Sequence, residues 1–141
     1  MTVAIKISLL GSGLVLLNGM LTGVWKYSRI IKSENHQAPV YVDIAHRASF
    51  FYSFACLVIA KLMEFSPFGE FWQIVIVAVP LSYFVLAVIG YMREGFLNRT
   101  DNMFRQRSFF TTWFMYGLIV GEIGGFALIL SGFIYSQFFM K

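Results

Sequence analysis

The sequence predicts an all-α integral membrane protein, a single domain over residues 1–141 that forms a bundle of four transmembrane helices. Of the 141 residues, 58% are hydrophobic and only 13% are charged, an apolar excess that the polar surface of a soluble domain could not cover. Four segments are each long enough to cross a hydrocarbon core, which takes about 20 apolar residues in a helix. Backbone amides in lipid must be satisfied within the segment, and a helix does this.

The four predicted helices cover residues 7–29, 44–64, 72–92 and 109–138. The first contains the run "ISLLGSGLVLLNGMLTGVW". This run is longer than the core of a cleavable signal peptide, and no small-residue cleavage site follows it. We therefore expect the first segment to remain as a helix of the mature protein.

The second predicted helix carries a stripe of small and polar side chains. Its members recur every three or four residues, and they are His46, Ser49, Ser53, Cys56, Ala60 and Glu64. Residues at this spacing share one helix face. In a membrane this face should point into the protein, while the aromatic residues on the remainder face acyl chains or a ring-shaped ligand.

The last two predicted helices contain residues that are unusual inside a membrane helix: a proline, a glutamate and three regularly spaced glycines. Tyr83 follows Pro80, which should disturb the third helix and free a carbonyl group. Glycines at four-residue intervals in the fourth helix predict close approach of another helix, and they are Gly117, Gly121 and Gly125. Glu122 lies near the middle of that helix, and an intramembrane carboxyl is a candidate functional group. A protonated Glu122 that only bonds a neighbouring helix is the alternative.

The distribution of Lys and Arg predicts the topology. Two connections hold most of them, namely Lys26, Arg29, Lys32 and Arg47 around the first, and Arg93, Arg99, Arg105 and Arg107 around the second. The other side has Lys6, Lys61 and Lys141. Cytoplasmic loops are enriched in these residues, so we expect both basic loops in the cytoplasm, both termini outside, and the bacterial inner membrane as the location. The net charge of +4 then needs no nucleic-acid partner.

The two histidines limit the metal and cofactor chemistry. A di-haem bundle with paired histidine ligands needs four, and a closed zinc site is disfavoured because His36 and His46 lie ten residues apart with no nearby cysteine. One haem with a single imidazole ligand remains open, with His46 on the iron. Its propionates would find Arg47, which follows directly, and Arg93 and Arg99 of the facing loop. The alternative is that His46 and Arg47 are ordinary interfacial residues.

Asp43 lies one turn before His46 on the same helical face. A ligating imidazole usually donates its second N–H to a nearby acceptor, which fixes the orientation of the ring. Asp43 is therefore the expected acceptor for His46.

The chain resembles the membrane-bound styrene oxide isomerases, which are four-helix proteins. The resembling segments are "GSGLVLLNGMLTGVW" (Gly11 to Trp25) and "AHRASFFYSFACLVIA" (Ala45 to Ala60). The resemblance implies haem b as cofactor, assembly as a homo-oligomer such as a trimer, and His46 as the axial ligand. It also implies iron acting as a Lewis acid on the oxygen of a small apolar epoxide. Where the family has an asparagine after the histidine, this chain has "RASFFYS" with Tyr52 near that position.

The candidate catalytic residues are Tyr52, Tyr83 and Glu122, and Tyr83 lies in the region where the family holds its substrate. Two other functions stay open. One is a non-enzymatic small subunit or scaffold of a larger membrane complex, docked through the glycine-rich fourth helix. The other is a small transporter that uses Glu122. Whether the protein is an enzyme is thus undecided by the sequence.

Overall fold

Four long helices make up the computed structural model, which describes residues 1–105 and 108–140. They are α1 (Val3–Lys32), α2 (Val40–Met63), α3 (Glu70–Leu97) and a fourth helix in which α4 (Met115–Ile134) lies between two π-helical turns, η1 (Phe110–Phe114) and η2 (Tyr135–Phe139). Each of the four is long and apolar enough to cross a membrane. The prediction of an all-α four-helix bundle is confirmed.

The helices extend beyond the predicted limits, most clearly where they carry charges. α1 runs to Lys32, and α3 runs to Leu97 before Asn98 ends it in the left-handed conformation, with φ of 46°. α2 begins at Val40, directly after Pro39. The predicted limits followed apolar residues, whereas helical hydrogen bonds continue through the polar interface as long as no residue breaks them.

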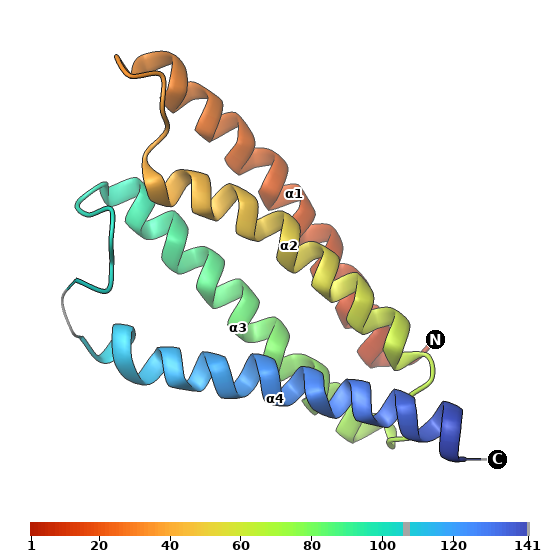
Figure 1. Ribbon diagram of the computed structural model, residues 1–141. Helices are drawn as coiled ribbons and strands as arrows, with labels where there is room; N and C mark the ends of the chain where they lie inside the picture. Colours follow the sequence, from red (N-terminus) through yellow and green to blue (C-terminus); the bar gives the residue numbers. More distant parts are fainter. Residues whose placement is uncertain (106–107, 141) are drawn as a thin grey trace.

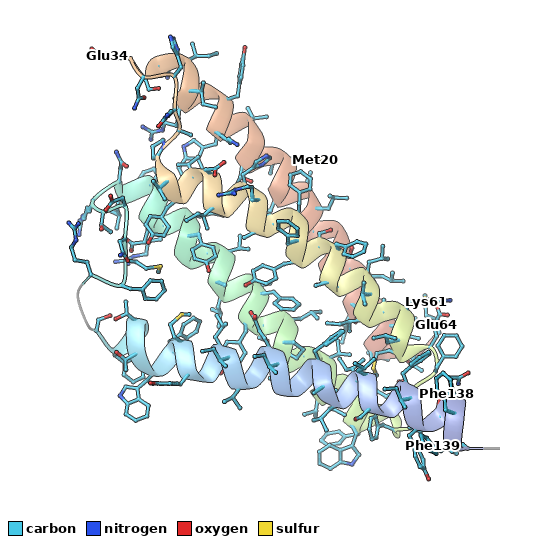
Figure 2. The ribbon with its side chains drawn as sticks, viewed as in Figure 1. Met20, Glu34, Lys61, Glu64, Phe138 and Phe139 are labelled. Carbon is cyan, nitrogen blue, oxygen red and sulfur yellow. The ribbon has the colours of Figure 1, made fainter. Side chains whose placement is uncertain are left out.

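Both connecting segments that carry the basic residues lie at one end of the bundle, and both chain termini lie at the other (Figure 1). This arrangement agrees with the predicted grouping of the basic loops. At the end with the termini, Lys61 pairs with Glu64, with 2.6 Å between Nζ and Oε2 (Figure 2). Large apolar side chains cover the outside, and Met20, Phe138 and Phe139 project away from the bundle (Figure 2).

α1 and α2 pack along a seam of small polar side chains. Ser12 and Ser53 exchange hydrogen bonds, since each hydroxyl donates to the other residue's carbonyl at 2.9 and 3.0 Å. One and a half turns further, Asn18 Nδ2 donates to Ser49 Oγ at 3.0 Å. Ser49, Ser53, Cys56 and Ala60 are all buried. These members of the small and polar stripe therefore point into the protein, as the sequence indicates, whereas Glu64 at its end is exposed and pairs with Lys61.

The main apolar core lies toward the end of the bundle that holds the termini. It brings together buried residues of all four helices, namely Ala4, Ile5, Cys56, Ile59, Ala60, Met63, Val77, Leu81, Phe84 and Ile129. Cys56 is a free, buried thiol within this core. The opposite, basic end has few of these contacts, and there the loops shape the surface.

α4 packs against α3 through its glycines. Gly117 and Gly121 face Tyr83, and Gly125 faces Pro80. The described backbones of α1 and the fourth helix do not come close to each other. The glycine face is thus filled within the chain, so docking onto a larger complex would need another surface.

Candidate functional site

His46 lies in the second turn of α2, with its imidazole directed at α1. Its Nδ1 is 2.9 Å from the carbonyl oxygen of Gly19. A carbonyl oxygen only accepts hydrogen bonds, so Nδ1 carries the hydrogen. With the hydrogen on Nδ1, the nitrogen left to bind a metal is Nε2.

The space for this ring comes from two glycines of α1, Gly19 and Gly23, one turn apart. A Cβ atom at Gly19 would lie 3.2 Å from Phe50 Cε2, and His46 faces Gly23 in the same way. Phe50 follows His46 by one turn and meets it edge to face, with 5.1 Å between ring centroids. Two rings on α2 therefore pack against two glycines on α1.

Asp43 is engaged elsewhere and is not the acceptor for His46. Its Oδ1 lies 2.6 Å from Lys26 Nζ, and its Oδ2 lies 2.7 Å from Arg47 Nη2. The expectation for Asp43 is thus corrected, because both oxygens pair with cations and the Gly19 carbonyl bonds the imidazole instead. A backbone carbonyl acceptor cannot be recognised from a sequence, because every residue has one. The glycine pair in "GMLTG", residues 19–23, was the available signal.

Tyr52 and Glu122 meet on another side of α2. The Tyr52 ring stacks on Phe84 with 4.4 Å between centroids, and its side chain interacts with the Glu122 carboxyl. Glu122 Oε1 is buried and has no hydrogen-bond partner among the described residues. Tyr83 packs against Gly117 and Gly121 of α4, and its ring centroid lies 5.7 Å from that of Phe114. Tyr52 and Glu122 are therefore brought together where α2, α3 and α4 meet, whereas Tyr83 packs on the glycine face of α4.

His46 and Tyr52 face different helices. Six residues separate them, which places them about 9 Å apart along α2 and about 120° apart around it. His46 contacts α1, whereas Tyr52 contacts α3 and α4. The predicted haem ligand and the predicted catalytic residue Tyr52 therefore lie in two separate clusters of the chain.

Arg93 lies near the end of α3 and Arg99 lies in the loop that follows, and neither is among the described contacts of His46. Arg93 Nη1 pairs with Glu94 Oε1 at 2.8 Å. Both arginines line surface cavities there. Of the three arginines expected to hold propionates, only Arg47 lies within one turn of His46 on α2.

Within residues 1–105 and 108–140, no three His, Cys, Asp or Glu side chains gather where they could hold a bare metal ion. No family model, curated protein or solved structure matches the chain. A functional assignment therefore rests on the geometry around His46 and around Tyr52 and Glu122.

Proposed function

We propose that this integral membrane protein binds one haem b and that His46 is the protein's axial ligand. The observation that carries the proposal is the hydrogen bond from His46 Nδ1 to the Gly19 carbonyl at 2.9 Å. This bond holds the ring and leaves Nε2 as the donor for iron. A haem with one protein ligand has a second face open to a substrate.

The surroundings of His46 suit a haem in three respects. Phe50 and Phe54, on the same side of α2, are both exposed, at 39% and 65%, and offer an apolar surface for the macrocycle. Arg47 has a side chain that is 62% exposed and lies near enough to bind a propionate. Third, the hydrogen bond to the Gly19 carbonyl keeps a hydrogen on His46 Nδ1 and leaves Nε2 for the iron. A haem on this outer edge would still face lipid, and we propose that a second copy of the chain covers it.

For activity, we propose isomerisation of a small apolar epoxide, in line with the family resemblance. The bound iron would supply a Lewis acid for the epoxide oxygen. His46 would hold that group, and the aromatic edge of α2 at Phe50 and Phe54 would exclude water from it. Tyr52, Tyr83 and Glu122 lie on another side of α2, so they have no assigned part in this step within one protomer.

The test is the Soret absorbance of protein purified in detergent from haem-replete cells. Wild-type protein should carry haem b, and His46→Ala should lose it. His36→Asn is the matched control, because His36 lies in an exposed turn with φ of 53°, which asparagine tolerates. A colourless wild type, or an unchanged band in His46→Ala, would refute haem binding. Coloured protein that turns over no epoxide would refute only the isomerase activity.

A small transporter is the second candidate, and Glu122 favours it. A buried carboxyl oxygen without a partner, next to Tyr52, is an arrangement that can bind a proton or a cation at membrane depth. Uptake of a cationic dye by proteoliposomes under a pH gradient would test this. Transport by wild type that is lost in Glu122→Gln supports it, and equal leakage by both contradicts it.

A further inference from the structure

A cavity of about 700 Å³ opens at the basic end of the bundle, between α3 and the start of the fourth helix. It is unrelated to His46 and to the Tyr52 cluster. Its lining residues are Leu86, Ile89, Gly90, Arg93, Glu94, Arg99, Thr100, Asn102, Met103, Arg105, Ser108 and Thr111. These residues combine about two turns of a membrane helix with a polar loop.

The lining changes from apolar to cationic along the cavity. Leu86, Ile89 and Gly90 form its α3 side, nearer the middle of the membrane. A Cβ atom at Gly90 would meet no atom within 4 Å, so the missing side chain leaves open space. Arg99 and Arg105 lie at the loop side. The cavity therefore has the polarity of a single lipid molecule, with an apolar part and an anion-binding part.

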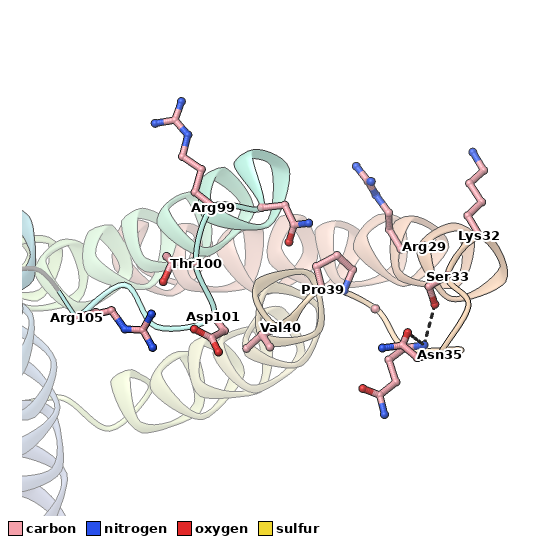
Figure 3. A pocket seen from close by; sticks show the side chains of 13 residues that line it. Arg29, Lys32, Ser33, Asn35, Pro39, Val40, Arg99, Thr100, Asp101 and Arg105 are labelled. Carbon is pink, nitrogen blue, oxygen red and sulfur yellow. Dashed lines mark hydrogen bonds between the residues drawn. The ribbon is translucent and has the colours of Figure 1, made fainter.

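The two loop arginines are available for an anion. Arg93 pairs with Glu94, whereas Arg99 and Arg105 have no ion-pair partner among the described residues. The same two arginines also line a neighbouring cavity of about 630 Å³ together with Arg29 and Lys32 (Figure 3). Asp101 is the one acidic residue of that lining, so the positive charge is in excess.

The loop that carries Arg99 and Arg105 is tied to the bundle. The backbone N–H of Met103 donates to the Tyr41 hydroxyl of α2 at 2.6 Å. The Tyr41 ring in turn stacks on Tyr91 of α3, with 6.4 Å between centroids. These contacts fix the loop backbone beside the cavity, while the side chains of Arg99 and Arg105 stay exposed.

A third cavity, beside the first, opens on the lipid-facing surface. Ile89, Arg93 and Arg99 also line this cavity, of about 580 Å³, together with Trp25, Met92, Phe96 and Leu97. Ile89 is 54% exposed and Phe96 is 74% exposed. The apolar face next to the cavity is therefore exposed where acyl chains would lie.

We propose that this cavity binds one anionic phospholipid of the leaflet at the basic end. The phosphate lies against Arg99 and Arg105, since a guanidinium group binds phosphate with two hydrogen bonds. One acyl chain passes beside Gly90 and Ile89. Basic pockets between transmembrane helices recognise lipid headgroups in this way. Arg99 thereby serves a lipid and not a haem propionate.

The first test is native mass spectrometry of the full chain in a neutral detergent, with phosphatidylglycerol and phosphatidylcholine as probes. We expect retained phosphatidylglycerol adducts and few phosphatidylcholine adducts. Arg99→Gln with Arg105→Gln should weaken phosphatidylglycerol binding about 25-fold, at about 5-fold for each arginine. The matched control is Arg29→Gln with Lys32→Gln, which removes equal charge outside this cavity. Equal weakening by the control pair would overturn the proposal, since any basic surface would then suffice.

The second test addresses the apolar part of the cavity. Gly90→Leu should fill it and lower phosphatidylglycerol retention, whereas Gly124→Leu should not, although Gly124 also meets no atom within 4 Å. Both variants should unfold at the wild-type temperature. Unchanged retention in Gly90→Leu overturns the proposed lipid. So does full displacement by millimolar inorganic phosphate, because the site would then bind a soluble anion.

Discussion

The imidazole of His46 occupies the space that a side chain at Gly23 would need. A Cβ atom at Gly23 would lie 2.9 Å from His46 Cε1 and 3.2 Å from its Nδ1. The ring is therefore held by two residues of α1, through contact with Gly23 and through the hydrogen bond to Gly19. This relationship ties the proposed haem ligand to the packing of α1 on α2.

Gly23→Leu should displace the His46 ring and break its bond to the Gly19 carbonyl. Loss of such a supporting contact typically weakens metal binding by about 10-fold or more, so the haem content per protein should fall. Gly13→Leu is the control, because a Cβ atom at Gly13 meets nothing within 4 Å. Haem content that falls equally in both variants would point to a general effect on α1.

Asp43→Asn should leave the haem in place. Asp43 bonds Lys26 and Arg47 but not His46, so the Soret band should keep its position and intensity. The two lost ion pairs are partly exposed and should lower the free energy of unfolding by about 1 kcal/mol, measured by thermal denaturation in detergent. A large loss of haem in this variant would instead favour the direct role that the sequence suggested.

Gly121→Leu should destabilise the bundle. A Cβ atom at Gly121 would lie 2.6 Å from Tyr83 Cδ2, so a larger side chain must push α4 away from α3. Overpacking of this kind costs about 1–3 kcal/mol. Gly124→Leu, three residues further on the open side of α4, should unfold at the wild-type temperature. Equal melting of the two variants would mean that the Tyr83 face tolerates side chains.

Tyr52 and Glu122 should be energetically coupled. Tyr52→Phe and Glu122→Gln each alter one partner, and contacting residues usually show an interaction energy of about 0.5–3 kcal/mol in a double-mutant cycle. The measurement is the free energy of unfolding of the wild type, both single variants and the double variant. Effects that simply add would show that the two side chains are independent.

The basic loops should be cytoplasmic and both termini outside. Reporter domains fused after Lys141 and inserted at Asn102 should therefore report opposite compartments, because Lys and Arg are concentrated in cytoplasmic loops. A reporter at Asn35 should agree with the one at Asn102, since both loops lie at one end of the bundle (Figure 1). Signals from the same compartment for Lys141 and Asn102 would contradict this topology.

The sequence by itself determined that the helices are apolar enough to cross a membrane, how many helices there are, and which face of α2 points inward. These follow from length, hydropathy and residue spacing, which act locally along the chain. The stripe from Ser49 to Ala60 is an example, because spacing alone places those residues on one face. The helix limits were less well predicted, since helices such as α1 continue into the polar interface through Lys32.

Only the tertiary structure decided which helix each face meets. His46 and Tyr52 belong to one short sequence segment. His46 nevertheless contacts α1, whereas Tyr52 contacts α3 and α4. The acceptor for His46 is a backbone carbonyl, which every residue has, so no residue type could reveal it. The cavity beside Gly90 likewise depends on how α3 and the fourth helix separate, and that separation is set by contacts between residues far apart in the chain.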